Sequence, residues 1–153
     1  MTSSHTVSDL ETHLGYWLRM VSNAVSQSFA RRVEAEGVTV AEWVFLRMLW
    51  DIDPVAPSLL AGRMGMTKGA ISKLADRLIG KALVERRADP VDGRAQILSL
   101  TAAGRVLVPR LAALADVNDA AFFGTLSPED RNDLERLLRK IVMDRKLTDV
   151  PTG

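Results

Sequence analysis

The segment from residue 61 to residue 80 sets the tightest limit on how this chain folds. A small residue, Ala61, is followed four places later by Gly65 and ten places later by the β-branched Ile71. This spacing lets two short helices cross closely around a tight turn, because glycine adopts the positive φ that the turn needs and the small alanine lets the second helix approach. Thr67 stands where a side-chain oxygen accepts hydrogen bonds from the free N–H groups of the second helix. The segment therefore predicts a helix-turn-helix.

The predicted second helix has one apolar face and one polar face. The apolar residues recur at the spacing of a buried helical stripe, and they are Ile71, Leu74, Ala75, Leu78 and Ile79. The opposite face carries short polar and cationic groups, which suit the phosphates and base edges of duplex DNA; they are Lys68, Gly69, Ser72, Lys73, Asp76 and Arg77. We expect Ser72 and Lys73 to reach base edges and Lys68 and Arg77 to contact phosphates. Thr67, at the start of the same helix, is a further candidate for DNA contact.

Two strand-like runs follow the helix-turn-helix, over residues 83–87 and 94–100, around a turn that contains Pro90 and Gly93. Such a pair predicts a β-hairpin, or wing. Arg94 at its tip is placed to enter a minor groove, where narrow A·T-rich stretches concentrate negative potential. Arg87 and Asp92 are the other candidate DNA-binding residues of the wing. We expect Asp89 and Asp92 to pair with Arg87 or Arg94 and so to orient the guanidinium.

These residues resemble the multiple-antibiotic-resistance regulator (MarR) family of bacterial winged-helix repressors. The motifs that carry the resemblance are Asp89-Pro90, Asp92-Gly93-Arg94 and Leu100-Thr101-Ala102-Ala103-Gly104. The resemblance extends upstream through residues 14–18 and 38–43 and downstream through 126–130, so it covers nearly the whole chain. Two positions depart from the family pattern. Gly93 replaces a common arginine, which removes one phosphate-binding charge, and Ala82 replaces a glycine, so that we expect the second helix to end without a left-handed cap and to fray at Gly80.

The chain as a whole predicts a single mainly α-helical domain over residues 1–153, with a winged helix-turn-helix core and a small β-hairpin. We expect a dimerisation helix over 8–36, opened by a capping box of Ser8 and Glu11, a winged lobe over 39–100, and C-terminal dimerisation helices over 101–146. The apolar stripes of the flanking helices lack enough neighbours in one chain, so we expect a homodimer. Two recognition helices about 34 Å apart would then bind a pseudo-palindrome in double-stranded DNA.

The resemblance also implies a small effector, because family members often bind phenolic or aromatic carboxylate ligands between the dimerisation helices and the DNA-binding lobe. By that resemblance, Trp17 and Trp43 would line the cleft, and His13 or Arg47 would meet an anionic group. Core and dimer packing is the simpler interpretation of the same aromatic residues.

Composition narrows the remaining choices. Between residues 63 and 94 eight cationic residues stand against four acidic ones, a net +4, whereas the whole chain carries only +1; positive charge is thus gathered where the DNA interpretation needs it. The absence of cysteine excludes thiol redox sensing and the peroxide-sensing branch of the family. No apolar run is long enough to span a bilayer and no leader is evident, so we expect a cytoplasmic protein without membrane contact.

Other functional classes have weaker support from the sequence. No catalytic constellation emerges, so we expect no enzyme activity and no cofactor; His13 is the one acid–base candidate in the expected cleft. His5, Asp9 and His13 recur at intervals of four, but they lack further ligands, so no metal site is expected. The alternative to DNA binding is a winged helix that serves as a protein-interaction module. Such a module would show neither salt-dependent DNA binding nor sensitivity to loss of Arg94.

Overall fold

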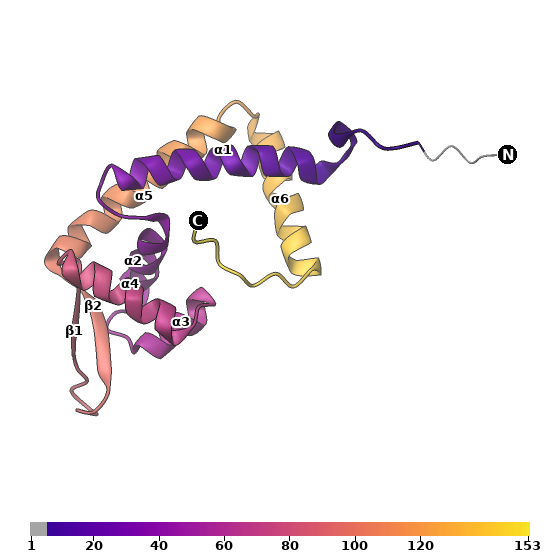
Figure 1. Ribbon diagram of the computed structural model, residues 1–153. Helices are drawn as coiled ribbons and strands as arrows, with labels where there is room; N and C mark the ends of the chain where they lie inside the picture. The colour runs from indigo at the N-terminus through magenta and orange to yellow at the C-terminus, as the bar shows by residue number, and fades with distance from the viewer. Residues whose placement is uncertain (1–5) are drawn as a thin grey trace.

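The computed structural model describes residues 6–153. Within them the chain is mainly helical, with one two-stranded antiparallel hairpin, which confirms the predicted fold class (Figure 1). None of the helices in this range is both long and apolar enough to cross a bilayer. The elements, in chain order, are a 3₁₀ turn η1 (Leu10–Thr12), α1 (Leu14–Glu34), α2 (Val40–Ile52), α3 (Pro57–Met64), α4 (Lys68–Gly80), β1 (Val84–Ala88), β2 (Gln96–Leu100), α5 (Ala102–Phe123) and α6 (Pro128–Asp144).

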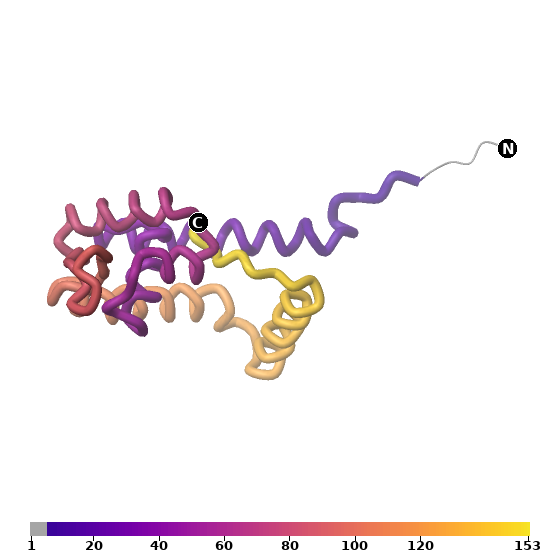
Figure 2. The backbone as a smooth tube through the Cα atoms, turned by 90° about the horizontal axis from the view of Figure 1, so that it is seen from below, coloured from indigo at the N-terminus to yellow at the C-terminus, as the bar shows by residue number. Residues whose placement is uncertain are grey.

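The two long helices and the lobe occupy different parts of the molecule. Helices α1 and α5 pack together, and α2, α3, α4 and the hairpin form the lobe beside them (Figure 1). The hairpin projects from the lobe on the side away from α1 (Figure 1). Helix α6 turns away from the end of α5 and stands clear of the lobe, as Figures 1 and 2 both show. The chain after α6 then returns towards α2.

One apolar core holds the lobe together. Helix α2 supplies its centre, because Phe45, Leu46 and Leu49 are all fully buried. The predicted stripe of α4 packs against it, with Ile71, Leu74, Ala75 and Leu78 buried and Ile79 partly buried at its edge. The remaining walls come from the other lobe elements and from α5, through Leu60, Met64, Val84, Leu98, Val108 and Leu111. The core therefore fixes which face of α4 is left for solvent.

Side-chain caps begin four of the helices where the sequence places them. Thr39 accepts a hydrogen bond from the Glu42 N–H at 3.1 Å, and Glu42 Oε1 accepts one from the Thr39 N–H at 2.8 Å, so the two residues form a capping box. Thr67, Thr101 and Ser127 each accept a bond at 3.1 Å from the backbone N–H three residues later. These polar residues satisfy N–H groups that a helix start otherwise leaves free.

The expected start of the first long helix is wrong. Helix α1 begins at Leu14 rather than Ser8, and neither Asp9 nor His13, the residues before η1 and α1, makes a side-chain cap. The Trp17 indole instead donates to the Glu11 carbonyl at 2.8 Å, and the Thr12 hydroxyl donates to the Asp9 carbonyl. These contacts fold residues 9–12 into a separate turn, so the capping box of Ser8 and Glu11 does not form.

The expected end of α4 is also wrong. Ala82 has φ +59°, the left-handed conformation that glycine usually supplies at this position. Its N–H donates to the Ile79 carbonyl at 2.9 Å, and the Leu83 N–H donates to the Leu78 carbonyl at 3.0 Å. Both bonds satisfy the last carbonyls of the helix, so α4 ends at Gly80 with an ordered left-handed cap rather than a frayed turn.

The connection between α2 and α3 pairs with the wing. Val55 exchanges two backbone hydrogen bonds with Leu98, at 3.0 Å and 2.8 Å, and so adds a short third partner beside β2. Asp53, whose side chain is only 6% exposed, accepts from the Leu100 N–H at 3.0 Å and from the Arg105 guanidinium at 2.7 Å. The base of the wing is therefore fastened to the lobe and to the start of α5.

Candidate nucleic-acid interface and effector cavity

The turn between α3 and α4 sets the direction of α4. Gly65 has φ +64°, as the spacing predicts, and its N–H closes the end of α3. An added Cβ at Gly65 would meet no other atom, so the need for glycine there is conformational rather than steric. Thr67 then opens α4 with its side-chain cap. Thr67 thus has a structural role in addition to its predicted place at the DNA surface.

The solvent face of α4 presents the residues predicted to contact DNA. Lys68, Ser72, Lys73 and Arg77 are all exposed, on the side of the helix opposite its buried stripe. Arg87 on β1 and Asp92 and Arg94 in the hairpin loop are exposed as well. The structure therefore leaves every predicted DNA-contact residue accessible, on α4 and on the adjoining wing.

The ion pairs divide the cations of this lobe into two groups. Arg86 pairs with Asp76 at 3.1 Å, which fastens β1 to α4, and Lys81 pairs with Glu42 at 2.9 Å. The other six cations of residues 63–94 form no ion pair within residues 6–153, and they are Arg63, Lys68, Lys73, Arg77, Arg87 and Arg94. A surface of uncompensated positive charge around a two-faced helix is the electrostatic footprint of a nucleic-acid-binding site.

The wing tip differs from the expectation in one respect. Asp89 and Asp92 form no ion pair with Arg87 or Arg94 in the described part of the chain. The Asp89 carboxylate accepts from the Val91 N–H at 2.9 Å, and the Asp92 carboxylate accepts from the Arg94 N–H at 3.1 Å. Aspartates favour such local turns because their short side chains reach the backbone two residues on. They shape the loop and leave both guanidinium groups free.

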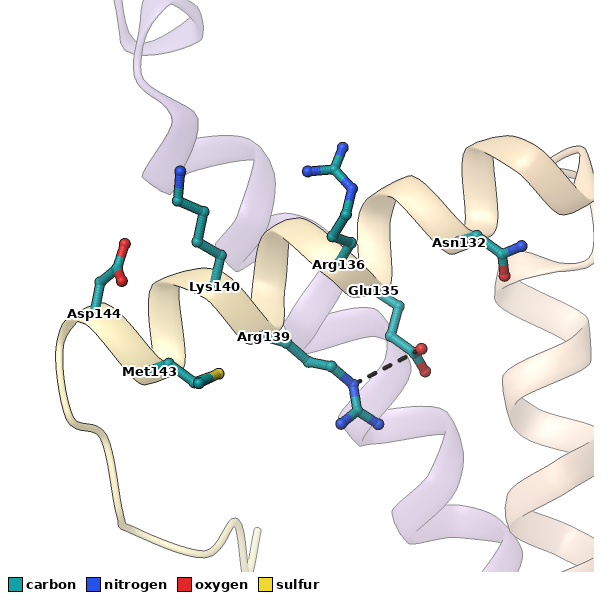
Figure 3. Close-up of a pocket in the computed structure, with 7 residues that line it drawn as sticks. All are labelled: Asn132, Glu135, Arg136, Arg139, Lys140, Met143 and Asp144. Atoms are coloured by element: carbon teal, nitrogen blue, oxygen red, sulfur yellow. Dashed lines mark ion pairs between the residues drawn. The ribbon is translucent and has the colours of Figure 1, made fainter.

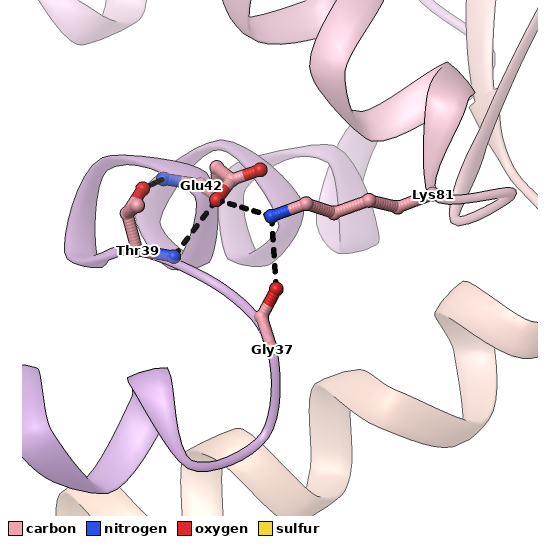
Figure 4. Close-up of polar contacts among 4 residues, drawn as sticks. All are labelled: Gly37, Thr39, Glu42 and Lys81. Carbon is pink, nitrogen blue, oxygen red and sulfur yellow. Dashed lines mark hydrogen bonds and ion pairs between the residues drawn. The ribbon is translucent and has the colours of Figure 1, made fainter.

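A buried carboxylate on α2 lies against the residue that follows α4 (Figure 4). Glu42 is 1% exposed, and its Oε1 accepts from the Lys81 ammonium at 2.9 Å while the same ammonium donates to the Gly37 carbonyl at 2.8 Å. Burial alone would raise the pKa of Glu42. The hydrogen bonds from Lys81 and Thr39 and the charge of Lys81 outweigh it, so the pKa lies below its ordinary value of 4.5.

A cavity of about 330 Å³ lies between the long helices and the lobe. Apolar side chains from α1, α2 and α5 form most of its wall, including Phe29 and Trp43, which meet edge to face with ring centres 6.4 Å apart. Its polar lining consists of Ser26, Asn118 and Asp119. The chain after α6 completes the lining, through Pro151 and Gly153. The cavity has the mixed character of small-molecule sites, mainly apolar with a few polar groups.

Only one of the four residues expected at an effector site lines this cavity. Trp43 does; Trp17 packs edge to face on Tyr16 at the far end of α1, His13 precedes that helix, and Arg47 pairs with Asp51 on the exposed side of α2 at 2.8 Å. No arginine, lysine or histidine lines the cavity within residues 6–153. The described part of one chain therefore brings no cation to this space.

Sequence reasoning missed the residue that joins the two long helices. Asn118 of α5 is 3% exposed; its amide oxygen accepts from Arg32 Nε at 3.2 Å and its NH₂ donates to the Val25 carbonyl at 3.2 Å. A lone asparagine within an apolar helix was the available signal, because a buried amide needs partners. Asn118 fixes α1 against α5 and also lines the cavity.

Helices α1 and α6 keep large apolar surfaces exposed. Four residues of α1 are 45–87% exposed, namely Leu14, Trp17, Leu18 and Val21, and four of α6 are 39–53% exposed, namely Leu137, Leu138, Ile141 and Val142. The hollow along α6 in Figure 3 is lined mainly by charged side chains, among them Arg136, Arg139 and Lys140. Monomers rarely leave contiguous apolar surface of this kind uncovered.

The part of the chain that the structure describes holds no cluster of three or more His, Asp or Glu residues able to bind a metal ion. His5, considered with Asp9 and His13, lies outside the described residues.

A helix-turn-helix with a cationic solvent face, flanked by a two-stranded wing, defines a winged-helix DNA-binding protein. Comparison with known proteins agrees. Residues 38–95 match the MarR family. A transcriptional regulatory protein for the hcr operon of Thauera aromatica is 30% identical, over 84% of this chain and 78% of that protein. An HTH-type transcriptional repressor of Mycobacterium tuberculosis is 29% identical, over 86% of this chain and 94% of that protein.

The fold comparison gives the same result. A mutant of MarR from Escherichia coli, solved in complex with operator DNA, superposes with a TM-score of 0.74 at 25% identity, covering 88% of this chain and 99% of that one. The chain belongs to the MarR family of DNA-binding transcriptional regulators, and its relatives are regulators rather than enzymes.

Proposed function

We propose that this regulator binds a pseudo-palindromic operator as a homodimer, acts as a repressor, and is released from DNA by a small aromatic or phenolic ligand. The observation that carries the DNA part is the set of six cations around the exposed face of α4 and the wing that form no ion pair within residues 6–153. In this proposal Ser72 and Lys73 contact base edges, Lys68 and Arg77 contact phosphates, and Arg94 enters the minor groove.

Salt dependence tests the DNA part directly. Operator affinity should fall steeply as salt rises, because each neutralised phosphate releases counterions. Arg94→Ala removes one such contact from each protomer, so the slope of log affinity against log salt should become shallower by about 2. Lys140→Ala removes the same charge from α6, which faces away from the lobe, and should leave the slope unchanged. DNA binding without salt dependence, or none at all, would favour the protein-interaction module instead.

The exposed apolar faces of α1 and α6 support the homodimer. The family fold favours a second copy of the chain as the partner that covers these faces, and a two-fold axis would bring the same faces together from both protomers. Replacing Ile141 with Glu places a charge on this surface and should convert the dimer to a monomer in sedimentation, with loss of operator binding. Arg136→Glu, on the charged side of α6, is the matched control and should remain dimeric.

The cavity beside Trp43 supports the effector part of the proposal. In the homodimer each protomer contributes one lobe and one recognition helix, α4. A ligand that binds better at one spacing of the two lobes than at another changes the distance between the two copies of α4. Because residues 6–153 supply the cavity lining with an amide, a hydroxyl and a carboxylate but no cation, a neutral phenol suits it better than an aromatic carboxylate. Titration of phenol and benzoate, followed by Trp fluorescence, compares the two. Stronger binding of phenol, weakened by Trp43→Ala, is the expected result.

A further inference from the structure

The residue that directly follows the recognition helix is tied to the turn that precedes α2. The Lys81 ammonium donates to the Gly37 carbonyl at 2.8 Å and to Glu42 Oε1 at 2.9 Å (Figure 4). These partners lie 44 and 39 residues away in the sequence. The contact therefore joins the end of α4 to the junction of α1 and α2.

The charge on Glu42 exceeds what helix capping requires. A glutamine completes a capping box as well as a glutamate does, because the box uses only one side-chain oxygen. Glu42 uses Oε1 both for the Thr39 N–H and for Lys81, while Oε2 is buried without a hydrogen-bond partner among the described residues. Keeping an ionised carboxylate there is unfavourable unless a cation compensates it. The cation that compensates the Glu42 carboxylate is the Lys81 ammonium.

The anchored residue is one helical turn from a predicted DNA contact. The Lys81 N–H donates to the Arg77 carbonyl at 3.1 Å, so the backbone of Lys81 is bonded directly to that of Arg77. The left-handed cap at Ala82 and the Leu83–Leu78 bond keep this end of α4 rigid. A shift of Lys81 would therefore move Arg77 with it.

We propose that Lys81 is a positioning residue for operator recognition, which sets the orientation of α4 by anchoring its C-terminal end to Glu42 and Gly37. The inference rests on the proposed DNA-binding function. Lys81 acts through α4 and needs no contact with DNA. Correct placement of the base-reading side chains distinguishes the operator from other DNA, whereas attraction to phosphates strengthens binding to operator and non-operator DNA alike.

The test compares affinity for the operator duplex with affinity for a scrambled duplex of equal length, using the full chain. Lys81→Met and Glu42→Gln should each reduce the operator-to-scrambled ratio by about tenfold, the size expected when a base contact is lost. The double variant should be no worse than either single one, because both remove the same ion pair between residues 42 and 81. Lys81→Arg should retain most of the ratio, since a guanidinium can reach the same two oxygens.

Glu42→Gln separates positioning from direct attraction. It removes a negative charge from the protein, so if Lys81 simply bound phosphate, this variant would bind DNA as well as or better than wild type. That result would overturn the inference. A core variant outside the contact, Val108→Ala, controls for stability and should keep the ratio within about twofold. Failure of the wild type to prefer operator would instead refute the proposed function.

Discussion

Replacing Ala82 with glycine should stabilise this protein, although glycine usually destabilises. Ala82 is held at φ +59° by the bonds that end α4 and by the Thr101 hydroxyl, which donates to its carbonyl at 2.7 Å. The left-handed conformation costs a residue with a Cβ about 1–2 kcal/mol. Glycine removes that cost but adds about 0.5–1 kcal/mol of unfolded-state entropy.

The difference between these terms gives the expected size. Ala82→Gly should raise the free energy of unfolding by about 0.5–1 kcal/mol, which for a chain of this length moves the melting temperature up by about 1–4 °C. Urea unfolding followed by circular dichroism measures it, at one fixed protein concentration because a dimer's stability depends on concentration.

A second alanine at a helix end supplies the control. Ala35 follows α1 at φ −62°, an ordinary right-handed conformation. Ala35→Gly gains no relief of strain and should lower stability by about 0.5–1 kcal/mol. The two substitutions should thus change stability in opposite directions. If Ala82→Gly destabilises as much as Ala35→Gly, the left-handed cap is not strained and the reasoning fails.

Three further predictions concern the fold. The pKa of Glu42 is lowered in the folded protein, so the stabilisation that its ionised carboxylate contributes should be complete above about pH 4.5 and be lost as the pH falls through the pKa of the folded state. The free energy of unfolding in urea, measured near neutral pH and at about pH 4, should therefore change less with pH in Glu42→Gln than in wild type. Gly104→Ala would place a Cβ 2.3 Å from the Leu83 carbonyl oxygen and should cost about 1–3 kcal/mol in thermal unfolding, whereas Gly62→Ala, with open space around it, should cost nothing. Asp53→Ala leaves the buried Leu100 N–H unpaired and should cost about 1–3 kcal/mol in urea, more than Arg105→Ala, whose side chain is half exposed.

Local signals made the lobe predictable from the sequence. The turn glycine Gly65, the cap residue Thr67 and the apolar stripe of α4 each depend on contacts within a few residues along the chain, and the structure confirms each of them. At the start of α1, two local structures were compatible with the sequence, and contacts with nearby side chains decided which one forms. Ser8 and Glu11 match a capping box in sequence, but the indole of Trp17 takes the Glu11 carbonyl and a separate turn forms.

Long-range contacts account for what the sequence did not reveal. The pairing of Lys81 with Glu42 and the bonds of Asn118 to α1 join residues from 39 to 93 positions apart, and no local pattern indicates them. Ala82 adopts the left-handed conformation that usually requires glycine, because the bond from the Leu83 N–H to Leu78 and the bond from the Thr101 hydroxyl to the Ala82 carbonyl hold it there. The roles of Lys68, Ser72 and Arg94 in DNA contact stay predictions, because they depend on a partner molecule.

The return of the chain to the cavity has a practical consequence for screening. Pro151 and Gly153 line the same space as Trp43, so an affinity tag fused after Gly153 would begin inside the wall of the cavity. Such a tag would crowd the space in which a phenol is expected to bind, and a failed screen would then report on the tag. A purification handle at the other end of the chain, or one removed by a protease before assay, leaves the cavity as the sequence builds it.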